Sequence, residues 1–289
     1  MNWTVEKQSN VCTAIRIPYE LNSDWEQWGL VTSDRHIDNE HSDIELQRLH
    51  LEQAKERGAF VTDFGDLFCA MQGKGDRRSN KSDLRAENKT GTYLNSLVEF
   101  AHDFLEPYAA NLALIGEGNH ETAITKNHEY SLLDGLLYTL HKSGSQAVRG
   151  GYRGYIRFMF EGPHGTKRMS RLAYYHHGSG GGGPVTKGTI QASRRAVYLI
   201  DADYVFTGHI HEQWIFPIER VKLLATGREL RETQYHVQVP TYKDEYTNHG
   251  GGFHHETGKP PKPIGAWWMR FYYSQRTGRV EVSFLEADK

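Results

Sequence analysis

Short apolar segments of this chain end repeatedly in aspartate, asparagine and histidine, and this repetition restricts the folds open to it. The segments lie at 28–33, 59–64, 111–115, 167–175 and 203–207. The segment at 28–33 is typical of a buried β-strand, and the other four are predicted as strands as well. The polar residues that follow are, in chain order, Asp34 and His36, Asp66, Asn119 and His120, His176 and His177, and His209 and His211. Ligands of open α/β sheets bind at the carboxyl ends of strands, so we expect these residues to meet in one crevice.

The segments between these strands predict an α/β fold. Helical patterns cover residues 42–58, 92–108, 130–142 and 186–200, and Gly58 stands where a helix C-cap belongs. The first helix joins strands 28–33 and 59–64, so these two strands should be parallel. Residues 152–161 and 167–175 predict an antiparallel hairpin turned at 162–165. Further strands are expected near 213–224, 233–239, 266–274 and 280–284, and long loops at 71–88 and 241–263.

Composition limits the class of protein. A chain of 289 residues with 12% aromatic residues is expected to fold as a single domain, 1–289, with its polar motifs within 34–211. Residues 212–289 add C-terminal strands and the Gly/His-rich loop at 241–263. The net charge of −2 gives no overall attraction to nucleic acid or membrane. Only Cys12 and Cys69 are present, and neither a signal peptide nor a long apolar run is seen, which predicts a cytoplasmic protein without a membrane partner.

The types of residue in the motifs suit a pair of metal ions. Two divalent cations about 3.5–4 Å apart repel each other, so a carboxylate between them is needed to hold the pair. Asp66 is the natural bridge. Asp34 with His36, and His209 with His211, place two ligands one residue apart, a spacing that lets both side chains reach a common centre. Asn119 offers a neutral oxygen, which keeps a metal Lewis-acidic.

In order, these motifs are Asp34-x-His36, Gly65-Asp66, Gly118-Asn119-His120-Glu121, a lone histidine and Gly208-His209-x-His211. This set resembles that of the calcineurin-like metallophosphoesterase superfamily, over well more than half of the chain. The resemblance implies an α/β fold, a four-layer α/β/β/α sandwich of mixed sheets with a dinuclear metal site at the strand ends.

The resemblance also implies roles for the residues. Asp34, His36, Asp66 and His211 would hold one metal, and Asp66, Asn119, His177 (or His176) and His209 the other. A hydroxide bridging the metals would attack phosphorus. His120 would stabilise the transition state or protonate the leaving oxygen, and Glu121 would orient His120. Many members of the family continue the Gly-Asp motif as Gly-Asp-x-x-Asp. This chain departs from that pattern, because Cys69 takes the place of the last aspartate. It also lacks the Asp-Arg-Gly of serine/threonine protein phosphatases.

Several residues have two interpretations. Adjacent strand residues face opposite ways, so one of His176 and His177 binds metal, and we favour His177 because it is the last residue before Gly178. The glycines at 178–183, among them Gly180, either cradle a phosphate or form a flexible linker. Arg77, Arg78 and Lys81 either bind substrate phosphates or lie in a solvated loop. His249, His254 and His255 either face the site or belong to a surface loop. Trp267 and Trp268 are expected in the core.

The function expected from these motifs is a dinuclear metal-dependent phosphoric ester hydrolase, acting on a phosphodiester or a phosphomonoester. A nuclease or a nucleotide phosphodiesterase leads among the substrate classes, because basic residues at 74–85 follow the bridging Asp66. A phosphatase acting on a phosphoprotein or a small molecule, a non-enzymatic binding module of the same fold and a mononuclear zinc hydrolase are the alternatives. The ligand types suit two ions of manganese, iron, zinc or nickel, with manganese favoured.

Overall fold

Two mixed β-sheets form the centre of the protein. The computed structural model describes residues 2–71, 83–165, 167–246 and 257–288. Sheet A contains, in spatial order, β1 (Thr4–Ser9), β2 (Cys12–Pro18), β7 (Arg153–Glu161), β8 (Arg168–His176), β9 (Tyr204–Thr207), β11 (Glu229–Gln238) and β10 (Trp214–Leu223). Sheet B contains β13 (Arg279–Glu286), β12 (Trp267–Ser274), β3 (Glu26–Thr32), β4 (Phe60–Asp63), β5 (Leu112–Ile115) and β6 (Val148–Arg149).

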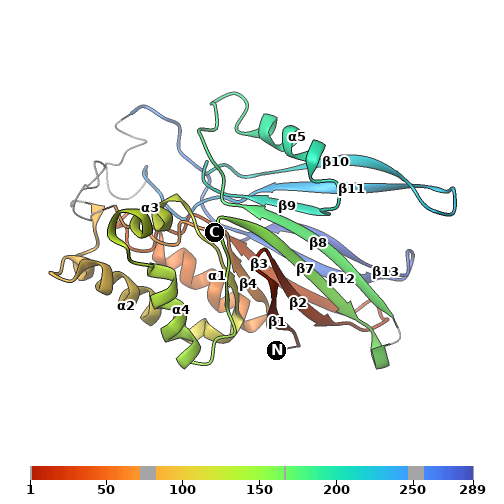
Figure 1. Cartoon of the computed structure of the whole chain (residues 1–289), viewed down its shortest axis with the longest axis horizontal. Helices are drawn as coiled ribbons and strands as arrows, with labels where there is room; N and C mark the ends of the chain where they lie inside the picture. Colours follow the sequence, from red (N-terminus) through yellow and green to blue (C-terminus); the bar gives the residue numbers. More distant parts are fainter. Residues whose placement is uncertain (1, 72–82, 166, 247–256, 289) are drawn as a thin grey trace.

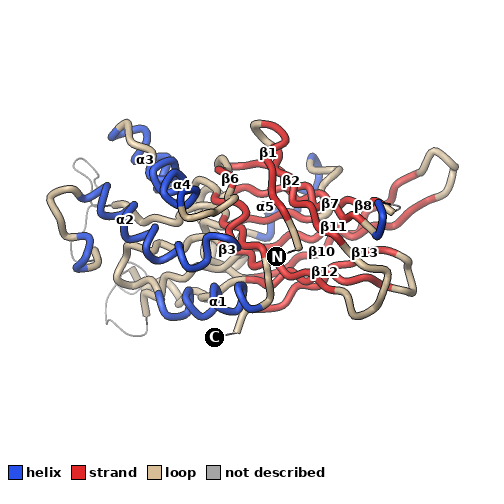
Figure 2. Tube along the Cα trace, turned by 90° about the horizontal axis from the view of Figure 1, so that it is seen from below, coloured by secondary structure: helices blue, strands red, loops and turns tan. Residues whose placement is uncertain are grey.

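Helices cover the outer faces of both sheets. The α-helices are α1 (Ile44–Glu56), α2 (Tyr93–Leu105), α3 (Asn119–His128), α4 (Leu132–Lys142) and α5 (Thr189–Tyr198). The first four gather at one end of the molecule on the side of sheet B, and α5 lies on the side of sheet A (Figure 1). Seen from below, strands of both sheets extend beyond the helices toward the opposite end (Figure 2). Within the described residues, no helix is both long and apolar enough to cross a membrane.

Three clusters of buried side chains separate these layers. Leu30, Leu51 and Leu97 belong to a cluster between sheet B and helices α1, α2 and α4. Aromatic residues of both sheets form the second, between the sheets. The third is small and packs Tyr174, Leu199 and Val205 beneath α5. The order is therefore helix, sheet, sheet, helix, which confirms the predicted four-layer α/β/β/α sandwich of mixed sheets.

The strands that lead to the predicted metal ligands have the expected arrangement. β3, β4 and β5 are parallel neighbours in sheet B, so their carboxyl ends lie at one edge. β7 and β8 form the predicted antiparallel hairpin, and β8 and β9 are parallel neighbours in sheet A. Helix α1 is capped by the Asp43 side chain, which accepts from the Leu46 N–H, and Gly58 follows with a φ of 59°. A left-handed residue after the last turn favours glycine, as predicted.

The sequence pattern did not reveal three parts of the fold. β1 and β2 form one edge of sheet A, but β1 is almost wholly exposed and so lacks an apolar face. β6 has only two residues. Helix α3 begins at Asn119, where the sequence analysis assigned no helix, and only Glu121 and Ile124 are buried in it. A helix with so narrow a buried face has no detectable apolar periodicity.

Aromatic rings hold the two sheets together. Phe158 of sheet A is 1% exposed and lies 5.6 Å from Phe60 and 5.0 Å from Phe271 of sheet B, measured between ring centroids. Such pairs add to the free energy gained by burying apolar area. Trp267 and Trp268 are buried, as predicted.

Truncating Phe158 therefore tests this inter-sheet core. We expect Phe158→Ala to lower the free energy of unfolding by about 3–5 kcal/mol, because it leaves a cavity between rings that cannot all move together. Phe216, on β10, is 38% exposed, and Phe216→Ala should change the same quantity by under about 0.5 kcal/mol. Urea titration followed by tryptophan fluorescence measures both. An equal loss in the two variants would contradict this account.

Candidate metal centre at the strand ends

Asp34 follows β3 directly and its carboxylate is fully buried. Its Oδ2 accepts hydrogen bonds from Ser33 Oγ at 2.6 Å and from the His209 N–H at 2.8 Å. The chain at Gly208 approaches so closely that a Cβ there would lie 2.0 Å from Ser33 Oγ. Burial alone would raise the pKa of Asp34, but the hydrogen bond and charge of His211 lower it to about 2. Asp34 is thus an ionised carboxylate inside the protein.

Asp34, His36 and His211 form the first cluster of metal-capable side chains. One ligand atom from each lies within 4.8 Å of the others. His211 Nε2 is 3.2 Å from Asp34 Oδ1 and 3.4 Å from His36 Nε2, so two ring nitrogens face each other beside a carboxylate. Burial lowers the pKa of His36 well below its usual value, which keeps this ring neutral. Neutral imidazole is the form that binds metal.

Asp66, His177 and His209 form the second cluster, again with one ligand atom each within 4.8 Å. His177 is completely buried, and its Nε2 lies 3.1 Å from Asp66 Oδ2 and 3.2 Å from Asn119 Oδ1. Its Nδ1 donates to the Phe64 carbonyl, which fixes the ring plane. Burial alone would lower the pKa of His177, but the Asp66 carboxylate raises it to about 10.

Asp66 lies near both clusters. The loop that carries it runs beside the Asp34 loop, with the His36 N–H donating to the Asp66 carbonyl at 3.0 Å. Its Oδ1 accepts from the His120 N–H at 3.0 Å, and a Cβ at Gly118 would lie 2.0 Å from this oxygen. Burial would raise the pKa of Asp66, but the charges of His120, His177 and His36 lower it far below its usual value. One carboxylate therefore interacts electrostatically with histidines of both clusters.

His120 and Glu121 have different partners from those expected. His120 Nδ1 donates to the Cys69 carbonyl, and its Nε2 lies 3.6 Å from Asp66 Oδ2. The Glu121 carboxylate accepts from the backbone N–H groups of Asp66, Phe68 and Gly118 at 3.1, 2.9 and 2.8 Å. Among the described residues, no hydrogen bond joins Glu121 to His120. That Glu121 orients His120 stays a prediction, and the contacts that Glu121 makes hold the Asp66 loop.

The backbone is left-handed at most of the candidate ligands. Among the described residues, nine that are not glycine have positive φ, and five of them are Asp34 (52°), His36 (44°), Asp66 (54°), His209 (72°) and His211 (54°). Each such conformation costs roughly 1 kcal/mol or more and is concentrated at functional sites in proteins. These left-handed residues direct the polar side chains toward the two clusters, whereas an extended backbone at the strand ends would direct them elsewhere.

Other predicted residues lie outside the two clusters. His176 turns away, because its Nδ1 accepts from the Gly178 N–H at 2.9 Å, and burial lowers its pKa to about 4. Gly180 has nothing within 4 Å of the position of a Cβ, and α5 begins only at Thr189; a phosphate cradle at this glycine stays a prediction. Arg77, Arg78 and Lys81, and likewise His249, His254 and His255, lie outside the described residues.

The structure adds residues that the sequence did not single out. Tyr152 packs edge-on against His176 and His177, and its hydroxyl donates to the Gly178 carbonyl at 2.7 Å. Beneath the site, Arg35 is 1% exposed and pairs with Asp63 at 3.0 Å. Asp38 accepts hydrogen bonds from the backbone of the Asp66 loop. These residues lacked a signal because their partners are distant in sequence.

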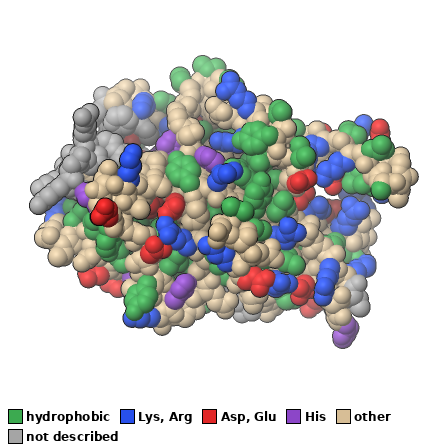
Figure 3. All heavy atoms as spheres, in the orientation of Figure 1, with side chains coloured by type: hydrophobic (Ala, Val, Ile, Leu, Met, Phe, Trp, Pro, Cys, Tyr) green, Lys and Arg blue, Asp and Glu red, His purple; other side chains and the backbone are tan. Residues whose placement is uncertain are grey.

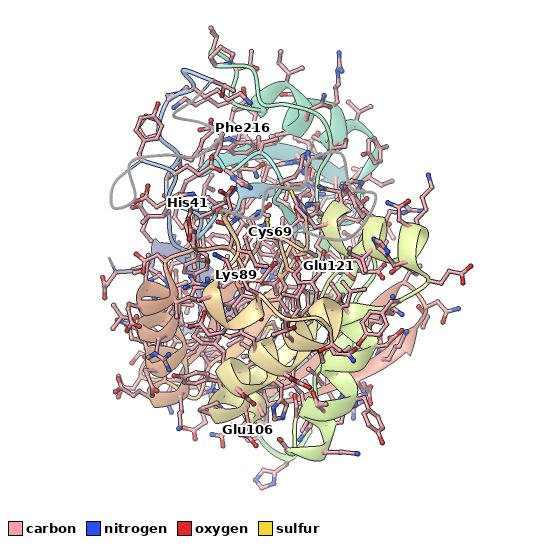
Figure 4. The ribbon with its side chains drawn as sticks, turned by 90° about the vertical axis from the view of Figure 1, so that its left-hand side faces the viewer. His41, Cys69, Lys89, Glu106, Glu121 and Phe216 are labelled. Atoms are coloured by element: carbon pink, nitrogen blue, oxygen red, sulfur yellow. The ribbon has the colours of Figure 1, made fainter. Side chains whose placement is uncertain are left out.

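The site lies toward the helical end of the molecule. Figure 4 looks onto this end and places Cys69, from the loop after β4, close to Glu121, from the first turn of α3. In the space-filling view, histidine side chains reach the surface between α5 and the helices of sheet B (Figure 3). Basic and acidic side chains are interspersed over the rest of that face.

Comparisons with known proteins find similar folds and no similar sequence. No protein-family model matches the chain, and neither does any curated protein. Vps29 of Entamoeba histolytica, solved with Zn²⁺, is 10% identical, with 90% of this chain and 99% of that chain covered and a TM-score of 0.36. A predicted phosphoesterase of Streptococcus pneumoniae is also 10% identical, with 91% and 99% covered and a TM-score of 0.32.

A third similar structure is longer. A putative 5'-nucleotidase of Staphylococcus aureus is 14% identical, with 92% of this chain but 55% of that chain covered and a TM-score of 0.42. At such identities the similarity concerns the fold alone. In this chain, two mixed sheets lie between helical layers, and paired His and Asp clusters stand at the strand ends. This is the layered arrangement, with metal-capable side chains at the strand ends, that the sequence motifs predicted.

Proposed function

We propose that this chain is a metal-dependent phosphoric ester hydrolase with two divalent cations. The observation that carries the proposal is the pair of clusters, Asp34–His36–His211 and Asp66–His177–His209, contributed by two sheets. A single cluster of this kind is compatible with a structural ion. Two adjacent clusters that share the field of one buried carboxylate favour a pair of ions, which is the arrangement of many phosphoesterases.

The residues fit metal ions chemically. His36 is 3% exposed and its Nδ1 is without a hydrogen-bond partner among the described residues, while its Nε2 faces His211 Nε2. Two facing imidazole nitrogens share at most one hydrogen, whereas a cation between them satisfies both. The donors are a mixture of imidazole nitrogen and carboxylate oxygen, which suits manganese, iron, zinc or nickel. We favour manganese.

The protein side chains would have separate tasks. The first cluster and Asp66 would hold one ion, and Asp66, Asn119, His177 and His209 the other. When bound, such ions supply Lewis acidity and lower the pKa of water. His120 is in neither Asp–His cluster, and its Nδ1 hydrogen is held by the Cys69 carbonyl. The doubly protonated ring would therefore give its Nε2 hydrogen to the leaving oxygen of the ester and become the neutral ring with its hydrogen on Nδ1. Glu121 would keep Asp66 in place through the backbone.

The proposed substrate class rests on the charge of one segment of the sequence. A phosphodiester of nucleic acid or a nucleotide is our leading proposal, supported by the basic residues at 74–85 of the sequence. Of these, Arg85 is engaged in the fold, since it donates to the carbonyls of Ile37 and Ser42 at 3.0 and 2.5 Å. A phosphoprotein or small-molecule phosphatase is the alternative within the same chemistry. A binding module that retains the fold without activity is the alternative outside it.

Turnover tests the enzymatic proposal. We expect Mn²⁺-loaded protein to hydrolyse bis(p-nitrophenyl) phosphate faster than p-nitrophenyl phosphate. For the corresponding phenyl ester, whose leaving oxygen needs a proton, His120→Ala should lower kcat about 10²- to 10⁴-fold, the usual contribution of a general acid. His102, which pairs with Asp103 away from the site, provides the control, and His102→Ala should retain full kcat. No turnover of either ester by the metal-loaded wild type would refute the enzyme and favour the binding module.

Metal content tests the ligand assignment. Elemental analysis should give two metal ions per chain, and a value of one would favour the mononuclear alternative. His177→Ala should weaken binding of one ion by at least about tenfold, because His177 Nε2 faces Asp66 and Asn119. His176→Ala is the matched control and should keep both ions. If the two variants exchanged these results, His176 would be the ligand.

A reduction in thermal stability should accompany metal removal. Ligands that bind only the folded chain stabilise it by about 2.7 kcal/mol at a concentration 100 times their Kd. We therefore expect a chelator to lower Tm and added Mn²⁺ to restore it, as measured by differential scanning calorimetry. Asp66→Asn should lose most of this response. A Tm that is independent of the metal would argue against specific binding in the folded protein.

A further inference from the structure

The ring of His120 is oriented by a peptide group and not by a side chain. Its Nδ1 contacts the carbonyl oxygen of Cys69. A carbonyl oxygen only accepts, so Nδ1 carries the hydrogen and Nε2 is directed toward Asp66. Cys69 stands where related chains frequently have an aspartate, but here the backbone of this residue, and not its side chain, makes the contact.

Asp38 holds that peptide group from the opposite side. Its Oδ1 accepts from the Cys69 N–H at 2.5 Å and its Oδ2 from the Ala70 N–H at 2.9 Å. The Cys69 carbonyl and the Ala70 N–H belong to one planar peptide unit and point in opposite directions. Fixing the N–H therefore fixes the direction of the carbonyl that receives His120.

The local backbone needs such support. Ala70 has a φ of 49°, a conformation that residues with a side chain avoid. Asp38 is 2% exposed, so its carboxylate has lost its hydration and depends on the N–H groups that it accepts from. It belongs to neither Asp–His cluster, although it follows His36 by two residues.

We infer that Asp38 is a positioning residue for His120, acting through the Cys69–Ala70 peptide. This inference rests on the proposed function in one respect, that His120 protonates the leaving oxygen. Asp38 selects the ring tautomer and the ring plane that present Nε2 to the reaction.

Kinetics with two leaving groups test the inference. In Asp38→Asn an amide NH₂ replaces one acceptor and faces a backbone N–H, so the peptide loses its fixed orientation. We expect kcat to fall about 10- to 100-fold for a phenyl ester, whose leaving oxygen needs a proton, with KM and metal content unchanged. The fall for the matching p-nitrophenyl ester should be under about threefold, since that oxygen leaves unprotonated. Equal losses for both esters would overturn the inference.

Two controls separate positioning from a general structural effect. Asp203 is also a shielded carboxylate that accepts a backbone N–H, from Leu172 at 2.8 Å, and Asp203→Asn should leave the ratio between the two esters unchanged. Adding Asp38→Asn to His120→Ala should cause no further loss of kcat, because the residue through which Asp38 acts is already absent. A further loss in the double variant would show a role independent of His120.

Ring NMR makes the test independent of turnover. Long-range ¹H–¹⁵N spectra, with the His120 signals assigned by their absence in His120→Ala, should show the hydrogen on Nδ1 in the wild type and a mixture of tautomers in Asp38→Asn. An unchanged tautomer would overturn the inference even in an inactive protein, whereas absent turnover alone would contradict only the proposed function. If circular dichroism finds Asp38→Asn unfolded, Asp38→Ser, which retains one acceptor, replaces it with the same expected results.

Discussion

Two carboxylates, Asp34 and Asp66, are buried at the ends of neighbouring strands, and much of the surrounding structure serves to keep them ionised there. A buried carboxylate without partners loses its hydration at a large cost in free energy, so it would take up a proton and become neutral. Each is therefore surrounded by backbone N–H groups, a hydroxyl or imidazole rings, supplied by segments far apart in the sequence. The close approach of Gly208 and Gly118 to these carboxylates follows from the same need.

The arrangement also explains the strained backbone. Strands β3 and β4 of sheet B and β9 of sheet A end close to these carboxylates. A strand that continued in extended conformation would direct alternate side chains to opposite faces of its sheet. Left-handed residues at Asp34, His36, Asp66, His209 and His211 direct them to one place instead. The strain is sustained by pairing of the loops with one another, as in the hydrogen bonds from Asp34 to Gly65 and from Ile37 to Leu67.

The sequence predicted the parts of the fold that depend on local patterns. Apolar runs identified β3, β4, β5 and β9, and the polar residues after them identified most of the candidate ligands. Helix α3 was missed because it buries so little, and the true partners of Glu121 were missed because backbone N–H groups leave no trace in a sequence. Asp38 was equally invisible, since its role depends on which way one peptide bond faces.

The six histidines and aspartates of the two clusters come from both sheets: Asp34, His36 and Asp66 follow strands of sheet B, while His177, His209 and His211 follow strands of sheet A. The distance between the sheets therefore sets how far apart these two sets of side chains lie. Phe64 joins the two, since its ring stacks on Tyr175 and Phe206 and its carbonyl holds His177. Packing between the sheets and the geometry of the clusters at their ends are thus linked through one residue.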